Sequence, residues 1–332
     1  MGVRDTLRLF WAVLRANPLT LAGFLMVAVL CGLAGIMAID PWLLVRYGPI
    51  QTSSASYAPP SWAHPLGTDN IGLDIYSEVM RALPLDLGIA LAIVGASVLI
   101  GGLLGLVAGY WDRPGTAGGA SSIVILRTTD VFLAFPSLLL ALAITISLGR
   151  GPWQAVLALM LTWWPYYVRL VRGEVLAVKH LTYIQAARAA GVSEGRIVLR
   201  HVVRNILEPI VVYLTMDIGT VLVVFSTIAF VADAIPYPSA TPEWGSMLSY
   251  YQQILPIASY PWLVFGPGAA IFLTVLAFSL LGDGLRDVLD PRTRRALVRS
   301  RSRPLPEAPA EPSPARPDDP EAKLSGEVPQ PA

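Results

Sequence analysis

The segment from Thr182 to Ile197 contains the residue pattern that bears most directly on function. Thr182 and Gln185 have the T-x-x-Q spacing of a capping box, in which each side chain bonds the backbone N–H of the other residue. Alanine, the strongest helix former, fills four of the five positions 186–190. Gly191 suits the left-handed conformation that ends a helix. The pattern therefore predicts a short helix over 183–190, about 12 Å long, followed by a sharp turn.

A second helix is expected after the turn, because Ser193 can cap it and Glu194 suits its first turn. Because most side chains of the first helix are alanine, its backbone is nearly uncovered. Such a helix can fit into a groove on another protein that is too narrow for a helix with bulky side chains. An ordinary loop helix on the membrane surface is the alternative, but such helices normally show a Leu, Phe or Trp face. We predict protein docking through Gln185, Ala186, Ala187, Arg188 and Gly191.

Catalytic and nucleotide-binding patterns are absent from the sequence. It has no G-x-x-x-x-G-K-[ST] motif and no Gly-Lys pair, so it contains no P-loop to hold ATP. The single cysteine excludes an internal disulfide, and the three histidines lack metal-ligand spacing. We expect no enzyme activity, cofactor or metal in this chain. Any energy must come from another subunit or from an ion gradient.

The composition is that of a membrane protein. Hydrophobic residues make up 54% of the 332 residues and charged residues only 14%, whereas soluble domains carry about 25% charge. Mean hydropathy is +0.58. The net charge of +1 gives no reason to expect a nucleic-acid partner. The runs are too long for membrane strands and lack alternation, so we predict an all-α protein embedded in lipid.

Six apolar runs approach the length of about 20 residues that a helix needs to cross a bilayer. The third run could begin earlier, near Ile123. The fourth has Arg169 only near one end, where the side chain can reach the interface. The six predicted membrane-spanning segments are residues 19–39, 87–110, 131–148, 152–171, 210–231 and 262–282.

The distribution of Lys and Arg predicts the orientation. Arg4, Arg8 and Arg15 precede the first span, which places the N-terminus in the cytoplasm. With six spans the C-terminus is also cytoplasmic, and 21 of the 24 Lys and Arg residues then lie inside. The chain divides into an N-terminal segment, a first span, an outside loop, a five-helix core containing the 182–200 loop, and a Pro-rich disordered tail: residues 1–18, 19–39, 40–86, 87–285 and 286–332.

Small residues and prolines within the spans predict helix packing and kinks. Gly101, Gly105 and Gly109 share one helix face and allow another helix to approach closely. Pro136 and Pro165 are expected to kink their helices. Outside the membrane, Asp69 and Asp74 lack the alternation of a calcium loop. A capped turn at the membrane edge is expected there instead.

Asp217 is the one acid well inside a predicted span, which makes it a functional candidate. Trp164 and Tyr167, in an aromatic cluster at 163–167, could line a transport path with it. Two structural alternatives stay open. Asp217 could hydrogen-bond Tyr213, Thr220 or a neighbouring helix, and the aromatic cluster could be an interfacial belt with a kink.

Several motifs together resemble a known family. Membrane subunits of ATP-binding-cassette importers carry an E-A-A pattern, then Gly, and Ile and Pro further on. In this chain the matching residues are Gln185-Ala186-Ala187, Gly191, Ile197 and Asn205, with Pro209 beyond them. Over roughly residues 15–295 the chain resembles the second permease of the dipeptide/oligopeptide importer group. The motifs that carry this wider resemblance are Asn17-Pro-Leu19, His64 to Asp69, Pro242 to Leu248, Leu281 to Asp287 and Asp290-Pro291.

The resemblance implies a complete transport machine. It implies a homologous permease partner, two ATP-binding subunits that hold ATP and Mg, and an extracytoplasmic substrate-binding protein, in the inner or plasma membrane of a prokaryotic cell. ATP binding would move the docked helix and open the path outward, and hydrolysis would reset it. The outside loops 40–86 and 232–261 would contact the binding protein. Peptides are the expected cargo, although relatives of this group also carry oligosaccharides or metal chelates.

The chain departs from the family pattern at four places. Gln185 replaces the usual Glu, so a charge that could pair with the ATPase is missing, and Arg204 replaces a usual Pro. Leu73 and the run Phe230–Ala234 replace motifs near the outside face. These last changes bear on the substrate more than on the mechanism. The competing class is a self-contained, gradient-driven transporter or channel centred on Asp217.

Overall fold

The described part of the chain is built from helices. The computed structural model describes residues 17–289 except 54, 114, 150, 234 and 255–258. In this part the only β-pairing is two isolated bridges, Thr52–Leu73 and Thr68–Asp74. The N-terminal arginines and nearly all of the Pro-rich tail lie outside the described residues, so the predictions made for them stay predictions.

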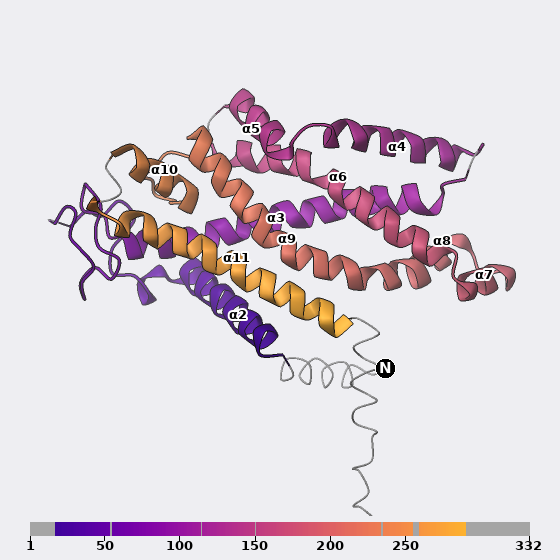
Figure 1. The fold of residues 1–332 in the computed structure, drawn as a ribbon, viewed down its shortest axis with the longest axis horizontal. Helices are drawn as coiled ribbons and strands as arrows, with labels where there is room; N and C mark the ends of the chain where they lie inside the picture. The colour runs from indigo at the N-terminus through magenta and orange to yellow at the C-terminus, as the bar shows by residue number, and fades with distance from the viewer. Residues whose placement is uncertain are drawn as a thin grey trace, which may run out of the picture. The chain divides into compact units, whose positions relative to one another are not determined.

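The long helices run alongside one another, with shorter helices at the two ends of the bundle (Figure 1). A 3₁₀ turn at Pro41–Leu43 and a π-helical turn at Val198–Val202 supplement them. The helices are α2 (Pro18–Ile39), α3 (Ile75–Tyr110), α4 (Ala117–Leu133), α5 (Ser137–Leu148), α6 (Pro152–Lys179), α7 (Thr182–Ala189), α8 (Glu194–Ile197), α9 (Val203–Ala232), α10 (Trp244–Ile254) and α11 (Trp262–Leu289).

Helix length and composition identify the candidate membrane spans. Four helical stretches of the described chain are long and apolar enough to cross a bilayer: α2, α3, α8 with α9, and α11. The pair α4 and α5 makes a fifth if it is counted as one span, although it bends by 84° at the break before Ser137. The expected kink at Pro136 is at this break, where Pro136 is the N-cap of α5. α6 has 28 residues but is less apolar, so the count of six stays a prediction.

The helix that contains the second predicted span begins before the apolar run at residue 87. α3 starts at Ile75 because Asp74 caps it, accepting a hydrogen bond from the Ser77 backbone N–H. Residues 75–86, which we had placed in the outside loop, are therefore the first turns of a 36-residue helix. At 1.5 Å per residue the helix is about 54 Å long. This exceeds the bilayer core of about 30 Å, so α3 extends beyond the hydrocarbon region.

The expected capped turn at Asp69 and Asp74 is confirmed. His64 Nδ1 lies 2.9 Å from Asp74 Oδ1, and both residues are buried. Asp69 Oδ1 accepts hydrogen bonds from the backbone of Ile71 and Leu73. Burial raises the pKa of Asp69, and these backbone hydrogen bonds oppose the shift. Asp69 and Asp74 thus stabilise the loop and attach it to the start of α3.

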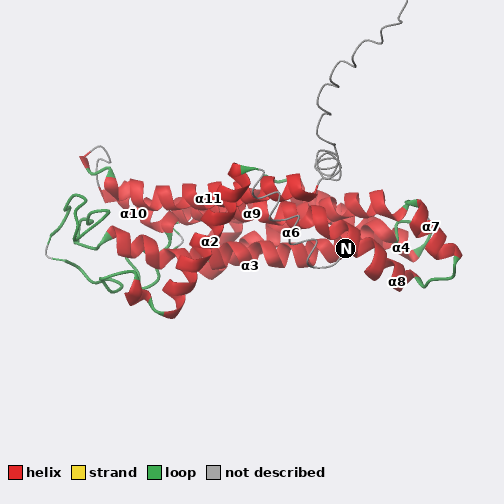
Figure 2. Cartoon of the chain, turned by 90° about the horizontal axis from the view of Figure 1, so that it is seen from below, coloured by secondary structure: helices red, strands yellow, loops and turns green. Residues whose placement is uncertain are grey.

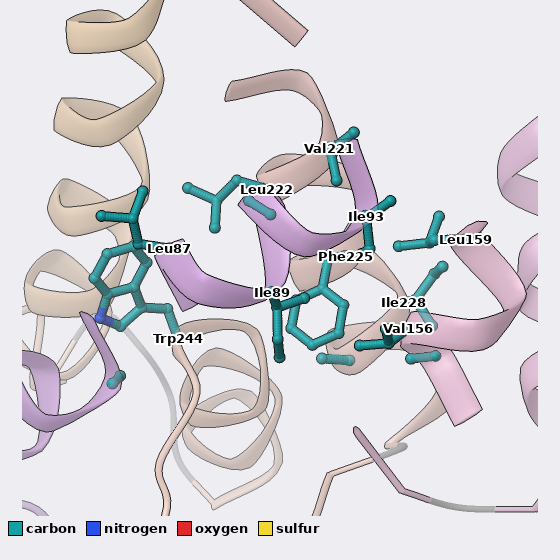
Figure 3. Close-up of a cluster of buried hydrophobic side chains, with 14 of the residues drawn as sticks. Leu87, Ile89, Ile93, Val156, Leu159, Val221, Leu222, Phe225, Ile228 and Trp244 are labelled. Carbon is teal, nitrogen blue, oxygen red and sulfur yellow. The ribbon is translucent and has the colours of Figure 1, made fainter. Parts of the chain in front are cut away.

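The main core lies where α3, α6 and α9 meet. Large apolar side chains from these three helices interdigitate, and Trp244 of α10 covers the outer end (Figure 3). The indole of Trp244 donates to the Val79 carbonyl at 3.0 Å, and its backbone N–H donates to Asp86 at 3.1 Å. The labelled core residues are Leu87, Ile89, Ile93, Val156, Leu159, Val221, Leu222, Phe225, Ile228 and Trp244.

The glycine face of α3 packs against α6, as predicted. A Cβ added to Gly105 would lie 2.7 Å from the Val168 carbonyl oxygen, and one added to Gly109 would lie 2.9 Å from Val175. Gly101 approaches the backbone at Trp164 in the same way. The two backbones are therefore in direct contact along about two turns of helix.

This contact predicts a sharp difference between neighbouring glycines. Gly105→Ala forces a methyl group against an α6 carbonyl, and we expect it to lower the free energy of unfolding by about 1–3 kcal/mol. Gly102→Ala is the matched control, because a Cβ there meets nothing within 4 Å. Thermal denaturation of the two purified variants measures the effect. Equal melting temperatures would show that the close contact is not what Gly105 provides.

Candidate functional site

The loop between α6 and α9 forms a compact helical unit at one end of the bundle. α7, the turn at 190–193 and α8 lie at the end opposite α10 (Figure 1), and the perpendicular view in Figure 2 shows the same separation. The predicted arrangement of a short helix, a turn and a second helix is confirmed. α7 covers Thr182–Ala189, within one residue of the expected 183–190.

The turn after α7 has the geometry that Gly191 predicted. Gly191 has φ +79°, in the left-handed region. Its N–H donates to the Arg188 carbonyl at 3.1 Å, and the Val192 N–H donates to the Ala187 carbonyl at 3.1 Å. These two bonds are the pair that defines a Schellman motif. They satisfy carbonyls at the end of α7 and fix the direction in which the chain leaves it.

The predicted capping box at the start of α7 is wrong. Leu181, not Thr182, is the N-cap residue, and no side chain caps the helix. Thr182 is already helical, so its hydroxyl cannot take the capping position, and the Gln185 side chain instead donates to the His180 carbonyl at 3.2 Å. Ser193 is the N-cap residue of α8 as expected, but its side chain makes no capping hydrogen bond.

Ile184 anchors α7 to the bundle, a role that sequence reasoning did not find. Its side chain is 0% exposed and belongs to a second apolar cluster with Tyr110, Val171 and Ile197. Ala187, one turn later, packs partly against the same cluster. The signal was available, because Ile184 is the one large aliphatic residue among the small and polar residues 182–190.

The opposite face of α7 carries small and polar side chains and is exposed. Gln185, Ala186 and Ala189 lie on this face, and Gly191 is exposed just beyond it. Ala187 is half-buried and faces the protein rather than the solvent. Of the predicted docking residues, the structure therefore brings Gln185, Ala186 and Gly191 to one accessible surface. We call this surface, with Ala189, the small-residue face.

Arg188 ties α7 to its neighbours. Its Nε donates to Glu194 Oε1 at 2.8 Å, and its Nη2 lies 3.2 Å from the Tyr110 hydroxyl. That hydroxyl also donates to Glu194. The bonds to Glu194 and Tyr110 raise the pKa of Arg188, so its charge is permanent. Arg188 thus joins α7 to α8 and to the end of α3.

Two further contacts complete the attachment of this unit. The Asn205 amide of α9 donates to the Tyr183 hydroxyl at 2.9 Å. Lys179, the last residue of α6, donates to the Gly109 carbonyl at 2.7 Å. α7 and its flanks are therefore bonded to α3 and α9 as well as following α6. The unit thus contacts three of the long helices, α3, α6 and α9.

A second group of functional candidates lies within the bundle. Asp217 Oδ2 accepts hydrogen bonds from Trp163 Nε1 and from the Tyr167 hydroxyl, each at 2.8 Å. The alternative in which Asp217 bonds a neighbouring helix is thus confirmed. Trp164 lies apart from this group and packs edge-on against Phe132 at 5.4 Å. Asp217 and the tyrosine also line one cavity between α6, α9 and α11.

The anchoring role of Ile184 gives a direct prediction. Ile184→Ala removes buried methyl groups at a cost of about 2–5 kcal/mol, and we expect amide hydrogen exchange within 182–192 to quicken at least tenfold. Leu199→Ala is the matched control, because Leu199 is 73% exposed. Exchange measured by mass spectrometry compares the two variants. Unchanged exchange in Ile184→Ala would mean that α7 is held by its hydrogen bonds alone.

The comparisons with known proteins agree with this architecture. A family model described as "Binding-protein-dependent transport system inner membrane component" matches residues 101–295. A probable D,D-dipeptide transport system permease protein from Escherichia coli (strain K12) is 35% identical, and the match covers 86% of this chain and 91% of that protein. A dipeptide transport system permease protein from Alkalihalophilus pseudofirmus is 37% identical, with 79% and 86% covered.

A third relative is a glutathione transport system permease protein from Pectobacterium atrosepticum. It is 36% identical, and the match covers 88% of this chain and 93% of that protein. The family model spans more than half of the chain, and the three relatives span most of it. The chain therefore belongs to the family of binding-protein-dependent transport system inner membrane components, the multi-pass permease subunits of ATP-binding-cassette importers.

Proposed function

We propose that this chain is a permease subunit of an ATP-driven importer of short peptides. The observation that carries the proposal is the position of α7. Side-chain contacts attach this helix to the bundle, and its small-residue face is exposed at the end of the bundle. The relatives named for dipeptide, D,D-dipeptide and glutathione transport support the substrate class. Importers of this family work with ATPase and substrate-binding partners, and the finer assignments below are part of the proposal.

The proposed assembly contains a homologous permease, two ATP-binding subunits and an extracytoplasmic binding protein. ATP and Mg belong to the ATP-binding subunits, because this sequence has no P-loop. The small-residue face of α7 enters a groove on one of them. With alanine at 186 and 189, the ATPase surface can approach the helix backbone closely. Gln185 offers an amide there in place of a charge.

The contacts of α7 with the rest of the bundle support a coupling mechanism. When the ATP-binding subunits close, they displace α7. Ile184, Arg188 and Tyr183 link α7 to the core, to α3 and to α9, so the displacement moves the long helices together instead of bending the loop. The path opens outward to receive substrate, and ATP hydrolysis restores the inward-facing state.

The orientation follows from the same assignment. If α7 meets the ATPase, its end of the bundle is cytoplasmic, as are both chain termini, in the inner or plasma membrane of a prokaryotic cell. The loops at 40–74 and 233–243, together with α10, then face outward and contact the binding protein. Glu243 caps α10 by accepting from the backbone of Gly245 and Ser246 at 2.8 and 2.7 Å, and Trp244 attaches the helix to α3.

Two alternatives are tested by the same experiments. The same machinery could carry oligosaccharides or metal chelates, or the chain could be a self-contained, gradient-driven transporter that uses Asp217. Purification of the chain from native membranes should bring down P-loop ATPases. The complete complex, reconstituted in vesicles loaded with ATP and supplied with its binding protein, should take up radiolabelled dialanine. Uptake without ATP that collapses with a protonophore would overturn the proposal.

The turn at Gly191 gives the sharpest test of coupling. A Cβ at this position meets nothing within 4 Å, so only the left-handed backbone (φ +79°) opposes substitution. Gly191→Val should cost about 1–2 kcal/mol or more in this conformation and misdirect the chain after α7. We expect ATP-driven dialanine uptake and binding-protein-stimulated ATP hydrolysis both to fall at least tenfold.

Gly191→Asn is the control for that variant. It adds a side chain of similar size, but asparagine tolerates the left-handed region. It should keep most of the uptake. Both variants should insert in the membrane at normal levels. Full transport by Gly191→Val in reconstituted vesicles would count against α7 as the coupling element.

A further inference from the structure

The cavity that contains Asp217 has an unusual chemistry for the interior of a membrane protein. It occupies about 570 Å³ between α6, α9 and α11. Four aromatic side chains line it together with one acid and one base: Trp163, Tyr166, Tyr167, Tyr213, Asp217 and Arg286. A carboxylate within a membrane-spanning segment costs free energy, and such residues usually have a function. The proposed function above uses α7 but gives the cavity no role.

The Asp217 carboxylate is oriented but not neutralised. Both of its hydrogen-bond donors, the Trp163 indole and the Tyr167 hydroxyl, are uncharged, and both bond the same oxygen, Oδ2. In the described part of the chain no protein donor bonds Oδ1, and no Lys, Arg or His forms an ion pair with Asp217. One oxygen of a fixed carboxylate is therefore available to a ligand.

Asp217 belongs to a polar stripe along α9. Tyr213, Asp217 and Thr220 follow one another at helical spacing, and two of them, Tyr213 and Thr220, are exposed. A stripe of this kind facing hydrocarbon would leave its polar groups unsatisfied. Its composition suits a face that meets water and cargo between two permeases.

The surroundings of Asp217 select an organic cation. An ammonium group can donate a charge-assisted hydrogen bond to Oδ1 and at the same time rest against aromatic ring faces, which attract cations. The rings of Trp163 and Tyr166 are adjacent, with centroids 5.5 Å apart. A metal ion fits poorly, because the described residues contain no group of three or more His, Cys, Asp and Glu that could hold one.

We propose that Asp217 and its aromatic neighbours form a transient binding site for the protonated amino group of the cargo. The inference rests on the proposed function, since it names the chemical group by which a peptide is recognised inside the permease. Trp163 and Tyr167 act as positioning residues that hold the carboxylate toward the cavity. Arg286 lines the same cavity and offers the opposite charge to the peptide's carboxylate.

Equilibrium dialysis on the complete purified complex, without ATP or binding protein, tests the site directly. Radiolabelled dialanine carries the amino group, and N-acetyl-dialanine lacks its charge. The wild-type complex should bind dialanine at least tenfold more tightly than N-acetyl-dialanine. Asp217→Asn should abolish this preference, because the amide can still accept from Trp163 and Tyr167 but carries no charge. Asp217→Glu should restore part of it.

Other outcomes would overturn the proposal. Asp217→Asn could bind dialanine as tightly as the wild type, or the wild-type complex could fail to prefer it. Asp217→Asn could also weaken both peptides equally with a lowered melting temperature, which would mean a structural role. Sensitivity of wild-type but not Asp217→Asn uptake to a protonophore would assign Asp217 to proton movement. In each case ATP-driven uptake by the wild-type complex still decides the proposed function separately.

Discussion

The direct backbone contact between α3 and α6 is the interaction on which the rest of the described structure depends. Glycines on α3 allow carbonyl groups of α6 to approach where any side chain would collide. This contact places Tyr110, at the end of α3, beside Arg188 and Glu194. It also fixes the α6 segment that carries Trp163 and Tyr167. Both functional regions are thus positioned by one packing arrangement.

Under the proposed function, α7 combines two requirements that normally conflict. A docking surface that admits another protein closely needs small side chains, but small side chains give a helix little to hold it in place. The helix satisfies both because its two faces differ. Ile184 and Arg188 attach the inner face, while Ala186 and Ala189 remain exposed on the outer one. A short helix of this kind is marginal in isolation, so tertiary contacts maintain it.

The two functional regions also share α6. Trp163 and Tyr167 lie within this helix, and α7 follows it after a turn of two residues. Under the proposed function, the motion that α7 receives and the carboxylate that α6 orients are therefore mechanically connected. A shift of α6 relative to α9 would change the hydrogen bonds to Asp217, and with them the direction in which its free oxygen points. The connection needs no additional coupling element.

Residue composition and spacing were enough to predict the all-α membrane class, the long apolar helices, the glycine contact, the short helix at 182–189 and the turn at Gly191. These follow from local composition and spacing, because a bilayer demands long apolar helices and a left-handed turn demands glycine. Tertiary structure alone decided the partners of individual side chains. Asp217 accepts hydrogen bonds from Trp163 and Tyr167 rather than from its own helix. Gln185 donates to the His180 carbonyl instead of forming a capping box, and the Ile184 side chain is buried. The neighbours of Asp217 and Ile184 depend on how helices distant in sequence are placed beside one another, and the partner of Gln185 depends on where α7 begins. Residue spacing along one segment does not contain that information.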